Sequence, residues 1–299
     1  SGFRRLRMTR SVALVTWSGL TALTADDRLL AIELARRGIA VRAVVWDDPR
    51  FDWRAFDLVV LRSTWDYHLR PDEFARWIAR MEAEGAPLRN RPQVIARNMH
   101  KGYLLELRDR GVPIVPTELI ARGASVALPE LFARNDWSRV VVKPAISATA
   151  FETIVVPAAE AHAAQRDLDR LLGVSDVLVQ PFVEELANCG EWSFVFFAGA
   201  YSHAVLKRPR PGDFRVQNDF GGTAEALTPD ETLIDQARAV VAANDAAALY
   251  ARVDGVEIDG IFHLMELELI EPALFLGWDV NAPRRFADVI VEAMRFGES

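Results

Sequence analysis

The chain has 299 residues, of which 51% are hydrophobic and 26% are charged, a composition typical of a globular protein with two or three domains. Its formal net charge of −7 argues against binding to nucleic acid or to an anionic membrane surface. No apolar run is long enough to span a bilayer, no signal-peptide pattern opens the chain, and the single cysteine, Cys189, cannot form an internal disulfide, so we expect a cytoplasmic enzyme or binding protein.

The first quarter of the chain alternates predicted strands with a predicted helix. Short apolar runs predict strands over 11–16, 39–46 and 58–62, and leucines at helical spacing predict a helix over 26–37 that Gly38 ends. This order is typical of a parallel α/β sheet. In such sheets, ligands bind beyond the carboxyl ends of the strands.

Polar and aromatic residues gather where these predicted strands end. The third strand leads into Arg62-Ser63-Thr64-Trp65-Asp66-Tyr67, and a helix is predicted to follow over 71–81. The run could either cap that helix or contact a substrate, and both interpretations stay open. The candidate substrate residues are Thr16, Ser63, Thr64, Trp65 and Asp66.

The remainder of the chain is predicted to form antiparallel strands with flanking helices. Strands are expected over 139–143, 154–156, 176–180, 192–197 and 202–207, helices over 98–110, 228–248 and 283–294, and a hairpin over 249–270. No linker rich in glycine or serine separates the two halves. We therefore expect rigid domains that close over a common cleft.

The stretch Met265–Pro272 alternates apolar and acidic residues before a proline stops it, which predicts a strand. Period 2 places Glu266 and Glu268 on one face. Two adjacent carboxylates repel each other unless a cation lies between them, and their hard oxygens suit Mg²⁺. An amphipathic strand with a solvated acidic face is the alternative.

Whether Asp254 joins these two carboxylates depends on the turn of the hairpin. A two-residue turn at 259–260 without a bulge pairs Asp254 with Met265 and places the aspartate on the wrong face. A three-residue loop over 258–260 pairs Asp254 with Leu264 and brings it to the face of Glu266. The metal interpretation therefore predicts the three-residue loop.

Two lysines are candidates for binding an anion. Lys143 ends an apolar strand, where an unpaired ammonium would be costly to bury, and a loop of small residues that includes Ser147 follows it. The backbone amides of that loop could approach phosphate oxygens, although the loop has no glycine. Lys101, near a predicted helix start, is the second candidate; a solvated lysine is the alternative.

Two further segments have a composition suited to binding. The connector Gln180-Pro181-Phe182-Val183 could offer its backbone and an aromatic ring to a flat base, or could simply cross between domains. Arg208 and Arg215 flank a loop at 211–213 and could make forked contacts with a carboxylate or phosphate.

Taken together, five ordered motifs resemble the ATP-grasp superfamily of ligases. They are Asn98–Lys101, Val142–Pro144, Gln180–Phe182, Arg252–Asp254 and Glu266–Pro272. The sequence looks most similar to the glutathione-synthetase-like and RimK-like branch. Four stretches resemble the subgroup that contains the cycloserine-forming O-ureido-serine cyclo-ligase: Arg62–Tyr67, Gly190–Trp192, His203–Pro209 and Glu266–Pro272.

The resemblance implies an α+β architecture of three domains. These would be an N-terminal parallel α/β substrate domain over 1–97, a small central domain over 98–178 and a C-terminal antiparallel domain over 179–299, with ATP between the last two. Lys101, Lys143 and Ser147 would face the ATP phosphates, the backbone of Gln180, Pro181, Phe182 and Val183 would hold adenine, and Glu191 would be an acidic residue of the nucleotide site. Asp254, Glu266 and Glu268 would bind Mg²⁺, and Arg208 and Arg215 would line the acyl-substrate side and act in catalysis.

The implied reaction joins a small-molecule carboxylate to an amine-type nucleophile through an acyl phosphate, releasing ADP and phosphate. Two Mg²⁺ ions are implied, for which Mn²⁺ could substitute. Related ligases have asparagine where this chain has Glu268. The segment 214–223 is expected to form part of a lid, beside the loop 147–151, because water would hydrolyse an acyl phosphate. Relatives are often dimers or tetramers, so a homo-oligomer stays open.

Three questions about the reaction stay open. The first is whether the ligation is intramolecular, as in the cyclo-ligase, or joins two molecules. The chain could also bind nucleotide without catalysis, which the lysine pair and the three carboxylates argue against. A metal-dependent phosphodiesterase is the third, and the acidic net charge disfavours nucleic acid as its substrate.

Overall fold

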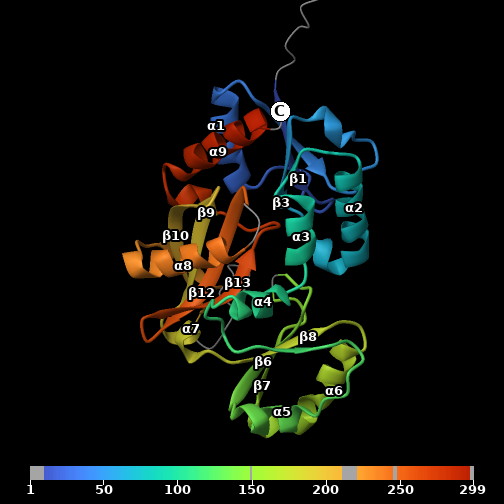
Figure 1. Ribbon diagram of the computed structural model, residues 1–299, viewed down its shortest axis with the longest axis vertical. Helices are drawn as coiled ribbons and strands as arrows, with labels where there is room; N and C mark the ends of the chain where they lie inside the picture. Colours follow the sequence, from blue (N-terminus) through green and yellow to red (C-terminus); the bar gives the residue numbers. More distant parts are fainter. Residues whose placement is uncertain (1–9, 149, 211–220, 245–247, 297–299) are drawn as a thin grey trace, which may run out of the picture.

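The computed structural model describes residues 10–148, 150–210, 221–244 and 248–296. In this part of the chain, three sheets follow one another along the long axis of the molecule (Figure 1). The loop containing Arg215 and most of the predicted lid lie outside the described residues. No helix in the described ranges is long and apolar enough to cross a membrane.

The first sheet is parallel, in the order β2-β1-β3-β4. Its strands are β1 (Ser11–Thr16), β2 (Ala40–Val45), β3 (Leu58–Ser63) and β4 (Leu88–Arg89). In β1, alternate residues face opposite sides: Val12 and Leu14 belong to one core cluster and Ala13 and Val15 to another. Both faces are thus buried, as expected where helices cover a parallel sheet on both sides.

Helices from both ends of the chain cover this sheet. One face packs against α1 (Ala25–Arg36) and α9 (Ala282–Phe296), and the other against α2 (Pro71–Ala83). Helix α1 begins where the Thr24 hydroxyl accepts a hydrogen bond from the Asp27 amide, a side-chain N-cap. The last helix of the chain therefore closes the core of the first sheet.

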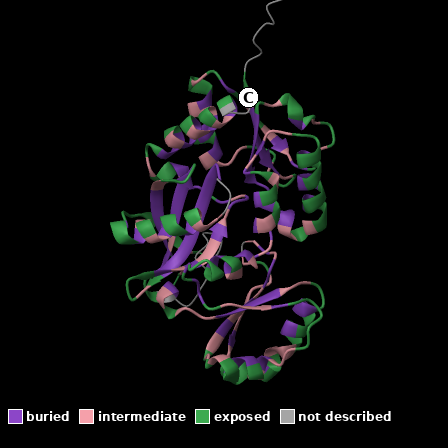
Figure 2. Cartoon of the chain, viewed as in Figure 1, coloured by how far each residue is buried: buried purple, intermediate pink, exposed green. Residues whose placement is uncertain are grey.

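The second sheet in chain order, called the central sheet below for its place in the sequence, lies at the end of the molecule away from the first sheet (Figure 1). It is small and antiparallel, in the order β5-β8-β6-β7. Its strands are β5 (Glu118–Ile120), β6 (Arg139–Pro144), β7 (Ile154–Pro157) and β8 (Val177–Pro181). Helices α5 (Leu128–Asn135) and α6 (Ala161–Leu172) pack on one face and share its core. Figure 2 shows buried strands with exposed outer helix faces, the pattern that amphipathic helices produce.

The third sheet is antiparallel, in the order β11-β10-β9-β12-β13. Its strands are β9 (Glu191–Phe197), β10 (Ala200–Arg208), β11 (Thr223–Ala226), β12 (Tyr250–Ile258) and β13 (Ile261–Glu268). Helix α8 (Glu231–Ala243) and the short α4 (Tyr103–Asp109) contribute to the core against it, and α7 (Glu184–Asn188) precedes it. Strand β13 lies at the edge, with its outer side facing the segment 98–115.

The predicted three-residue loop of the β12–β13 hairpin is wrong. Ile258 pairs with Ile261, so the turn consists of Asp259 and Gly260 alone, both at positive φ (52° and 79°). This is the pattern of a tight hairpin turn of type I′. A register shift between Asp254 and the next residue then inserts a β-bulge. The two-residue turn alone would have placed Asp254 on the face opposite to Glu266. The bulge shifts the register by one residue, so Asp254 lies on the same face as Glu266.

The predicted helix over 98–110 is also wrong in its first part. A helix α3 (Pro92–Asn98) ends where that helix was expected to begin, and α4 starts only at Tyr103. Between them the Lys101 amide donates to Ala145 O (2.8 Å), a bond to the loop after β6 rather than to a helical turn. In this segment a hydrogen bond to a distant loop thus outweighs the local preference for a helix.

The predicted α+β class, with a parallel first sheet and antiparallel central and C-terminal sheets, is confirmed. The strands of the three sheets fall within 11–89, 118–181 and 191–268. The division into domains at 97 and 178 stays a prediction. Helix α9 shares a core with the first sheet although it lies in the predicted third domain.

Candidate active site

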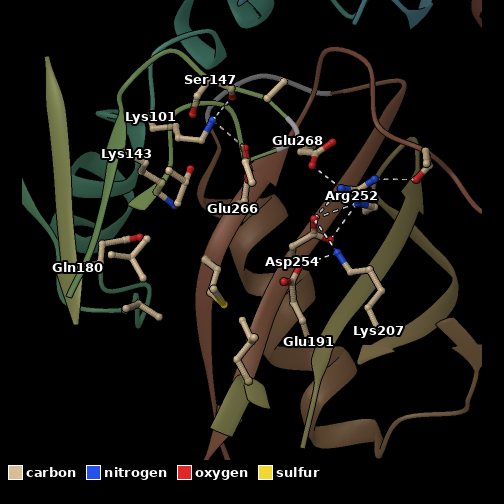
Figure 3. A pocket seen from close by; sticks show the side chains of 18 of the residues that line it. Lys101, Lys143, Ser147, Gln180, Glu191, Lys207, Arg252, Asp254, Glu266 and Glu268 are labelled. Atoms are coloured by element: carbon tan, nitrogen blue, oxygen red, sulfur yellow. Dashed lines mark hydrogen bonds and ion pairs between the residues drawn. The ribbon is translucent and has the colours of Figure 1, made fainter. Parts of the chain in front are cut away.

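A cavity of about 380 Å³ lies between the central sheet and the third sheet, with its far end against the first sheet (Figure 3). Residues of β6 and β8 line one side, and residues of β12 and β13 line the other. Trp65 and Tyr67, from the end of the first sheet, also reach it. The cavity thus lies where segments far apart in the sequence meet, as small-molecule sites often do.

Lys101 and Lys143 lie next to Glu266 in the wall of the cavity (Figure 3). The Lys101 ammonium lies 3.1 Å from Glu266 Oε1 and also donates to Ser147 O. Lys143 has no ion pair within the described residues, and its burial lowers its pKa to about 8 despite the attraction of Glu266. Burial would raise the pKa of Glu266, but the two lysines outweigh it and lower that pKa. Two cations that line one cavity suit a polyanionic ligand.

The predicted connector lines the cavity next to these lysines. Gln180, Pro181, Phe182 and Val183 all contribute to its wall. The Gln180 side chain donates to Thr117 Oγ1 (2.8 Å). A guanidinium, that of Arg139, lies 3.5 Å above the centre of the Phe182 ring and holds the ring by a cation–π contact. The structure therefore brings Lys101, Lys143, Ser147 and the connector together at one cavity, while their role in binding ATP stays a prediction.

A second set of charges lies deeper, on β9, β10 and β12. Arg252 donates from Nε to Asp254 Oδ1 (2.9 Å) and from Nη2 to Oδ2 (2.7 Å), a forked pair. Ser193 donates to Asp254 (2.6 Å), while Lys207 lies 2.5 Å from Glu191 and 3.6 Å from Asp254. Burial would raise the pKa of Asp254, but Arg252 and Lys207 outweigh it and lower the pKa to about 2. Asp254 is therefore ionised and fully engaged.

Glu268 and Glu271 carry carboxylates whose charge is less well compensated. Burial and the repulsion of Asp254 and Glu266 outweigh the attraction of Arg252 and raise the pKa of Glu268 to about 7. Burial, followed by the neighbouring Glu268, raises the pKa of Glu271 well above its ordinary value. Within the described part of the chain, no three His, Cys, Asp or Glu side chains lie close enough together to hold a metal ion. The carboxylates line one cavity, where Asp254 and Glu268 share Arg252 and Glu266 pairs with Lys101.

Side chains from 98–103 hold the edge strand that carries Glu266 and Glu268. Asn98 donates to Leu267 O (2.8 Å) and accepts from the Leu269 amide (2.9 Å), so its amide group substitutes for a neighbouring strand. Tyr103 Oη accepts from the Leu267 amide (3.0 Å). Because β-strand side chains alternate, fixing Leu267 and Leu269 orients the glutamates between and before them toward the cavity.

The predicted substrate residues lie in different surroundings. Thr16 donates to Leu20 O and accepts from Ser63 Oγ (2.9 Å), both buried within the first sheet. Thr64 is buried, and its hydroxyl has no hydrogen-bond partner in the part of the chain that the structure describes. The remaining two are Asp66, which accepts from Trp46 Nε1 (2.9 Å), and Trp65. Of the five, Trp65 alone lines the cavity in the described residues.

Of the two predicted catalytic arginines, Arg208 does not line this cavity. Arg208 is exposed and lies 3.3 Å from Glu225 on the neighbouring strand β11. Its predecessor Lys207 faces inward instead, because successive strand residues point to opposite faces. Arg215 lies outside the described residues.

Several residues that line the cavity were not predicted from the sequence. Arg252, Lys207, Tyr67 and Glu271 all contribute to its wall; each lies within a motif quoted from the sequence, but none was named as a site residue. Arg252 precedes Asp254 by two residues, so period 2 alone places both on one face. Lys207 is adjacent to Arg208, so one of the two had to face inward. The sequence could not show which one, because the strand register decides it.

Comparison with known proteins places this arrangement in a family. The family model for the N-terminal domain of D-cycloserine synthetase DcsG matches residues 12–90. The cycloserine biosynthesis protein DcsG of Streptomyces lavendulae is 32% identical over 301 residues, an alignment that covers 93% of this chain and 99% of that protein. The chain belongs to the DcsG family.

Solved structures agree with this assignment to the DcsG family. The crystal structure of D-cycloserine synthetase DcsG has a TM-score of 0.86 and 30% identity, with 95% of this chain and 99% of that one covered. A RimK domain ATP-grasp protein of Sphaerobacter thermophilus DSM 20745 has a TM-score of 0.68 and 20% identity, with 94% and 98% covered. A D-alanine–D-alanine ligase of Bacillus anthracis, solved with ATP, has a TM-score of 0.69 and 15% identity, with 97% and 99% covered. The chain is an ATP-dependent C–N ligase with the ATP-grasp fold, as its sequence predicted.

Proposed function

We propose that this DcsG-family ligase activates the carboxylate of a small amino-acid-like substrate as an acyl phosphate, which a nitrogen nucleophile then attacks. The observation that carries the proposal is the placement of Lys101 and Lys143 next to Glu266 in one cavity, beside the connector 180–183. The lysines would face the phosphates of ATP, and the connector would hold adenine. Glu191, paired with Lys207, lies at the deeper end of the same cavity.

The carboxylates Glu266 and Glu268 fit a Mg²⁺ site by the chemistry of their donors, since hard, negatively charged oxygens suit this ion. The raised pKa of Glu268 supports this, because it reflects burial and then the repulsion of Asp254 and Glu266, both of which a bound cation would offset. Asp254 could join only by releasing part of its contacts with Arg252 or Ser193. One or two bound ions, with Mn²⁺ as a substitute, would neutralise charge on the β- and γ-phosphates.

The residues of the cavity can support both steps of this reaction. A substrate carboxylate oxygen attacks the γ-phosphorus, the bond to the β,γ-bridging oxygen breaks, and ADP leaves with that electron pair. The nitrogen lone pair then attacks the acyl carbon, the nitrogen loses a proton, and phosphate leaves with the C–O bonding pair. Lys101, Lys143 and Arg252 provide the positive charge that stabilises the transferring phosphoryl group, a step that needs positioning rather than a covalent protein nucleophile.

We further propose that the nucleophile and the carboxylate belong to one molecule, so that a ring closes. The name of the relative DcsG, D-cycloserine synthetase, supports a ring closure on O-ureido-serine or a close analogue. Ligation of two separate amino-acid-like molecules is the competing outcome.

The test measures ADP release with ATP, Mg²⁺ and each candidate carboxylate, followed by product masses. The panel contains D- and L-O-ureido-serine, single amino acids and pairs of amino acids. We expect ADP release with one O-ureido-serine enantiomer and a product without a second amino acid. Hydroxylamine added as an external nucleophile should yield a hydroxamate if an acyl phosphate forms. A dipeptide mass would instead establish intermolecular ligation, and ADP release without any hydroxamate would count against the acyl phosphate.

A further inference from the structure

Five successive backbone carbonyls, from Ile270 to Leu274, each accept a hydrogen bond from a side chain. The donors in chain order are Tyr250 Oη (2.7 Å), Trp65 Nε1 (3.4 Å), Arg62 Nη2 (3.2 Å), Arg252 Nη1 (3.0 Å) and His203 Nε2 (2.9 Å). Because a carbonyl only accepts, His203 carries its proton on Nε2 in this contact. The loop 270–275 belongs to no helix or strand, so side chains replace the partners that a ladder would supply.

The five donors come from two distant parts of the fold. Arg62 lies on β3 of the first sheet, Trp65 lies in the loop that follows β3, and the other three lie on β10 and β12 of the third sheet. The loop 270–275 also lines the cavity through Glu271 and Phe275. It therefore connects the first sheet with the wall of the active site.

Arg62 is the most deeply buried charge among these donors. Its side chain is 2% exposed, and its Nε donates to Asp27 Oδ1 of α1 (2.7 Å), which is 1% exposed. The guanidinium carbon lies 5.7 Å from the ring centre of Tyr250 and 5.9 Å from that of Phe286. Its Nη1 has no hydrogen-bond partner among the described residues. A buried donor without a partner costs stability. A gain in stability from the ion pair with Asp27 therefore does not explain why an arginine is buried here.

The contact of Arg62 with the loop lies next to a contact of Arg252. Arg62 binds Pro272 O and Arg252 binds Ala273 O, so adjacent peptide groups connect the two guanidiniums. Arg252 also donates to Asp254 and to Glu268. A shift of the loop would remove one of the fixed contacts that orient Arg252 in the cavity.

We infer that Arg62, anchored by Asp27, is a positioning residue that orients Arg252 through the loop 270–275. The catalytic consequence rests on the proposed function, in which Arg252 faces the transferring phosphoryl group. The inference gives part of the Arg62–Tyr67 motif a specific role, because Arg62 and Trp65 bind the carbonyls of Pro272 and Glu271.

The geometry requires arginine rather than lysine at this position. The planar guanidinium donates from Nε to Asp27 and from Nη2 to Pro272 O at the same time. An ammonium on a lysine side chain could keep the ion pair but could not reproduce the fork. Arg62→Lys therefore keeps the positive charge beside Asp27 but loses the hydrogen bond to the loop.

The test compares Arg62→Lys with Arg37→Lys as a matched control. Arg37 lies at the C-terminal end of α1 and pairs with Glu33 (2.8 Å) and with Asp288 of α9 (2.6 Å), without touching the loop 270–275. Hydrogen–deuterium exchange, which needs no substrate, is measured on the ligand-free proteins. Steady-state ADP release with ATP and O-ureido-serine gives kcat and the two KM values.

We expect Arg62→Lys to speed amide exchange within 273–277 and to lower kcat by about tenfold, the loss expected for one oriented hydrogen bond, with KM for ATP within about twofold. Arg37→Lys should leave amide exchange within 273–277 and kcat unchanged. If Arg62→Lys does not fold, Asp27→Asn is expected to give the same pattern more weakly.

Unchanged loop exchange in Arg62→Lys would overturn the inference. Equal losses in both variants, matched by equal losses of thermal stability, would also overturn it, because they would show a merely structural role. If the wild-type protein releases no ADP, the proposed function fails, and loop exchange alone then supports or overturns the positioning of Arg252.

Discussion

Asp254 lies directly opposite Glu266 in the β12–β13 hairpin. The pairing depends on two local features, a two-residue turn at Asp259-Gly260 and a bulge between Asp254 and Gly255. Without the bulge, the turn would place Asp254 opposite Met265, and a one-residue slip moves every side chain to the other face. The bulge therefore decides whether three acidic side chains share the cavity.

Replacing Gly255 by alanine should disturb this bulge. A Cβ atom at that position would lie 2.3 Å from His263 O and 2.5 Å from the Phe262 ring, closer than atoms can pack. We expect a loss of about 1–3 kcal/mol in the free energy of unfolding and a larger fall in ADP release than stability explains. Urea denaturation and turnover measurements check both.

The control for this variant is Gly260→Ala in the turn of the same hairpin. A Cβ atom there meets no described atom within 4 Å, and only the positive φ of 79° opposes it. We expect about 1–2 kcal/mol of destabilisation with the register, and hence turnover per folded molecule, preserved. Equal turnover losses in the two variants would argue against a role for the bulge in the site.

Glu266→Gln combined with Glu268→Gln should abolish metal-dependent ATP turnover. The two amides keep the shape of the side chains but remove the negative charge that a divalent cation requires. We expect at least a hundredfold fall, about 2.7 kcal/mol of transition-state stabilisation. The measurement is ADP release over a Mg²⁺ titration.

Glu257→Gln is the matched control, because Glu257 is exposed on β12 of the same hairpin. It should leave turnover unchanged. Turnover of the double variant at the level of this control would remove Glu266 and Glu268 from the proposed metal site.

Nucleotide binding should be accompanied by proton uptake at mildly alkaline pH. The pKa of Lys143 is lowered to about 8 by burial, so at pH 8.5 much of this side chain is neutral in the free protein. Phosphate groups nearby favour the charged form and raise that pKa, so binding recruits a proton. At pH 6.5 Lys143 is already charged, and the uptake should vanish.

Calorimetric titration of a non-hydrolysable ATP analogue in buffers of different ionisation enthalpy measures this uptake. Lys143→Met should eliminate it and weaken binding. Uptake that persists in Lys143→Met would assign the proton to another group and would place the phosphates elsewhere.

The free protein should also gain stability between about pH 8 and pH 10.5 through Lys143. In this window the unfolded chain binds more protons than the folded one, so the free energy of unfolding rises with pH. The difference between wild type and Lys143→Met, followed by denaturation across this range, isolates the contribution. A difference that does not change with pH would contradict the lowered pKa.

Asn98→Ala should loosen the strand that carries the two glutamates. It leaves Leu267 O and the Leu269 amide without partners, and an unpaired buried polar group costs about 1–3 kcal/mol. Asn135→Ala is the control, since Asn135 is half-buried at the far end of the central sheet and bonds Leu131 O. We expect the larger loss of both stability and turnover in Asn98→Ala, and equal losses would contradict the role of Asn98.

Local sequence pattern predicted most elements because it reports which face of an element is buried. The alternation in β13 and the apolar runs of β1 and β3 required no knowledge of the rest of the chain. The helix expected over 98–110 failed because its first residues bond to a loop more than forty residues away in sequence, at Ala145. Helix propensity depends on local residue types and contains no information about a distant partner of this kind.

The choice between Arg208 and Lys207 shows the same limit at the site. Both are basic and adjacent, and only the pairing of β10 with β9, which places Lys207 opposite Glu191, determines which one faces the cavity. The role of Arg62 was likewise hidden, because its partners Asp27 and Pro272 are 35 and 210 residues away.

The sequence by itself determined the chemistry that this protein can hold: the lysines, the carboxylates of 266–268, the connector 180–183 and their order, which identified the ATP-grasp ligases. The tertiary structure decided which of these groups meet. It replaced a three-residue loop by a turn and a bulge, brought Arg252 and Lys207 to the cavity in place of Arg208, and attached the loop 270–275 to Arg62. The physical reason is that residue type and spacing fix local faces, whereas strand register and contacts between distant segments are set by the packing of the whole chain.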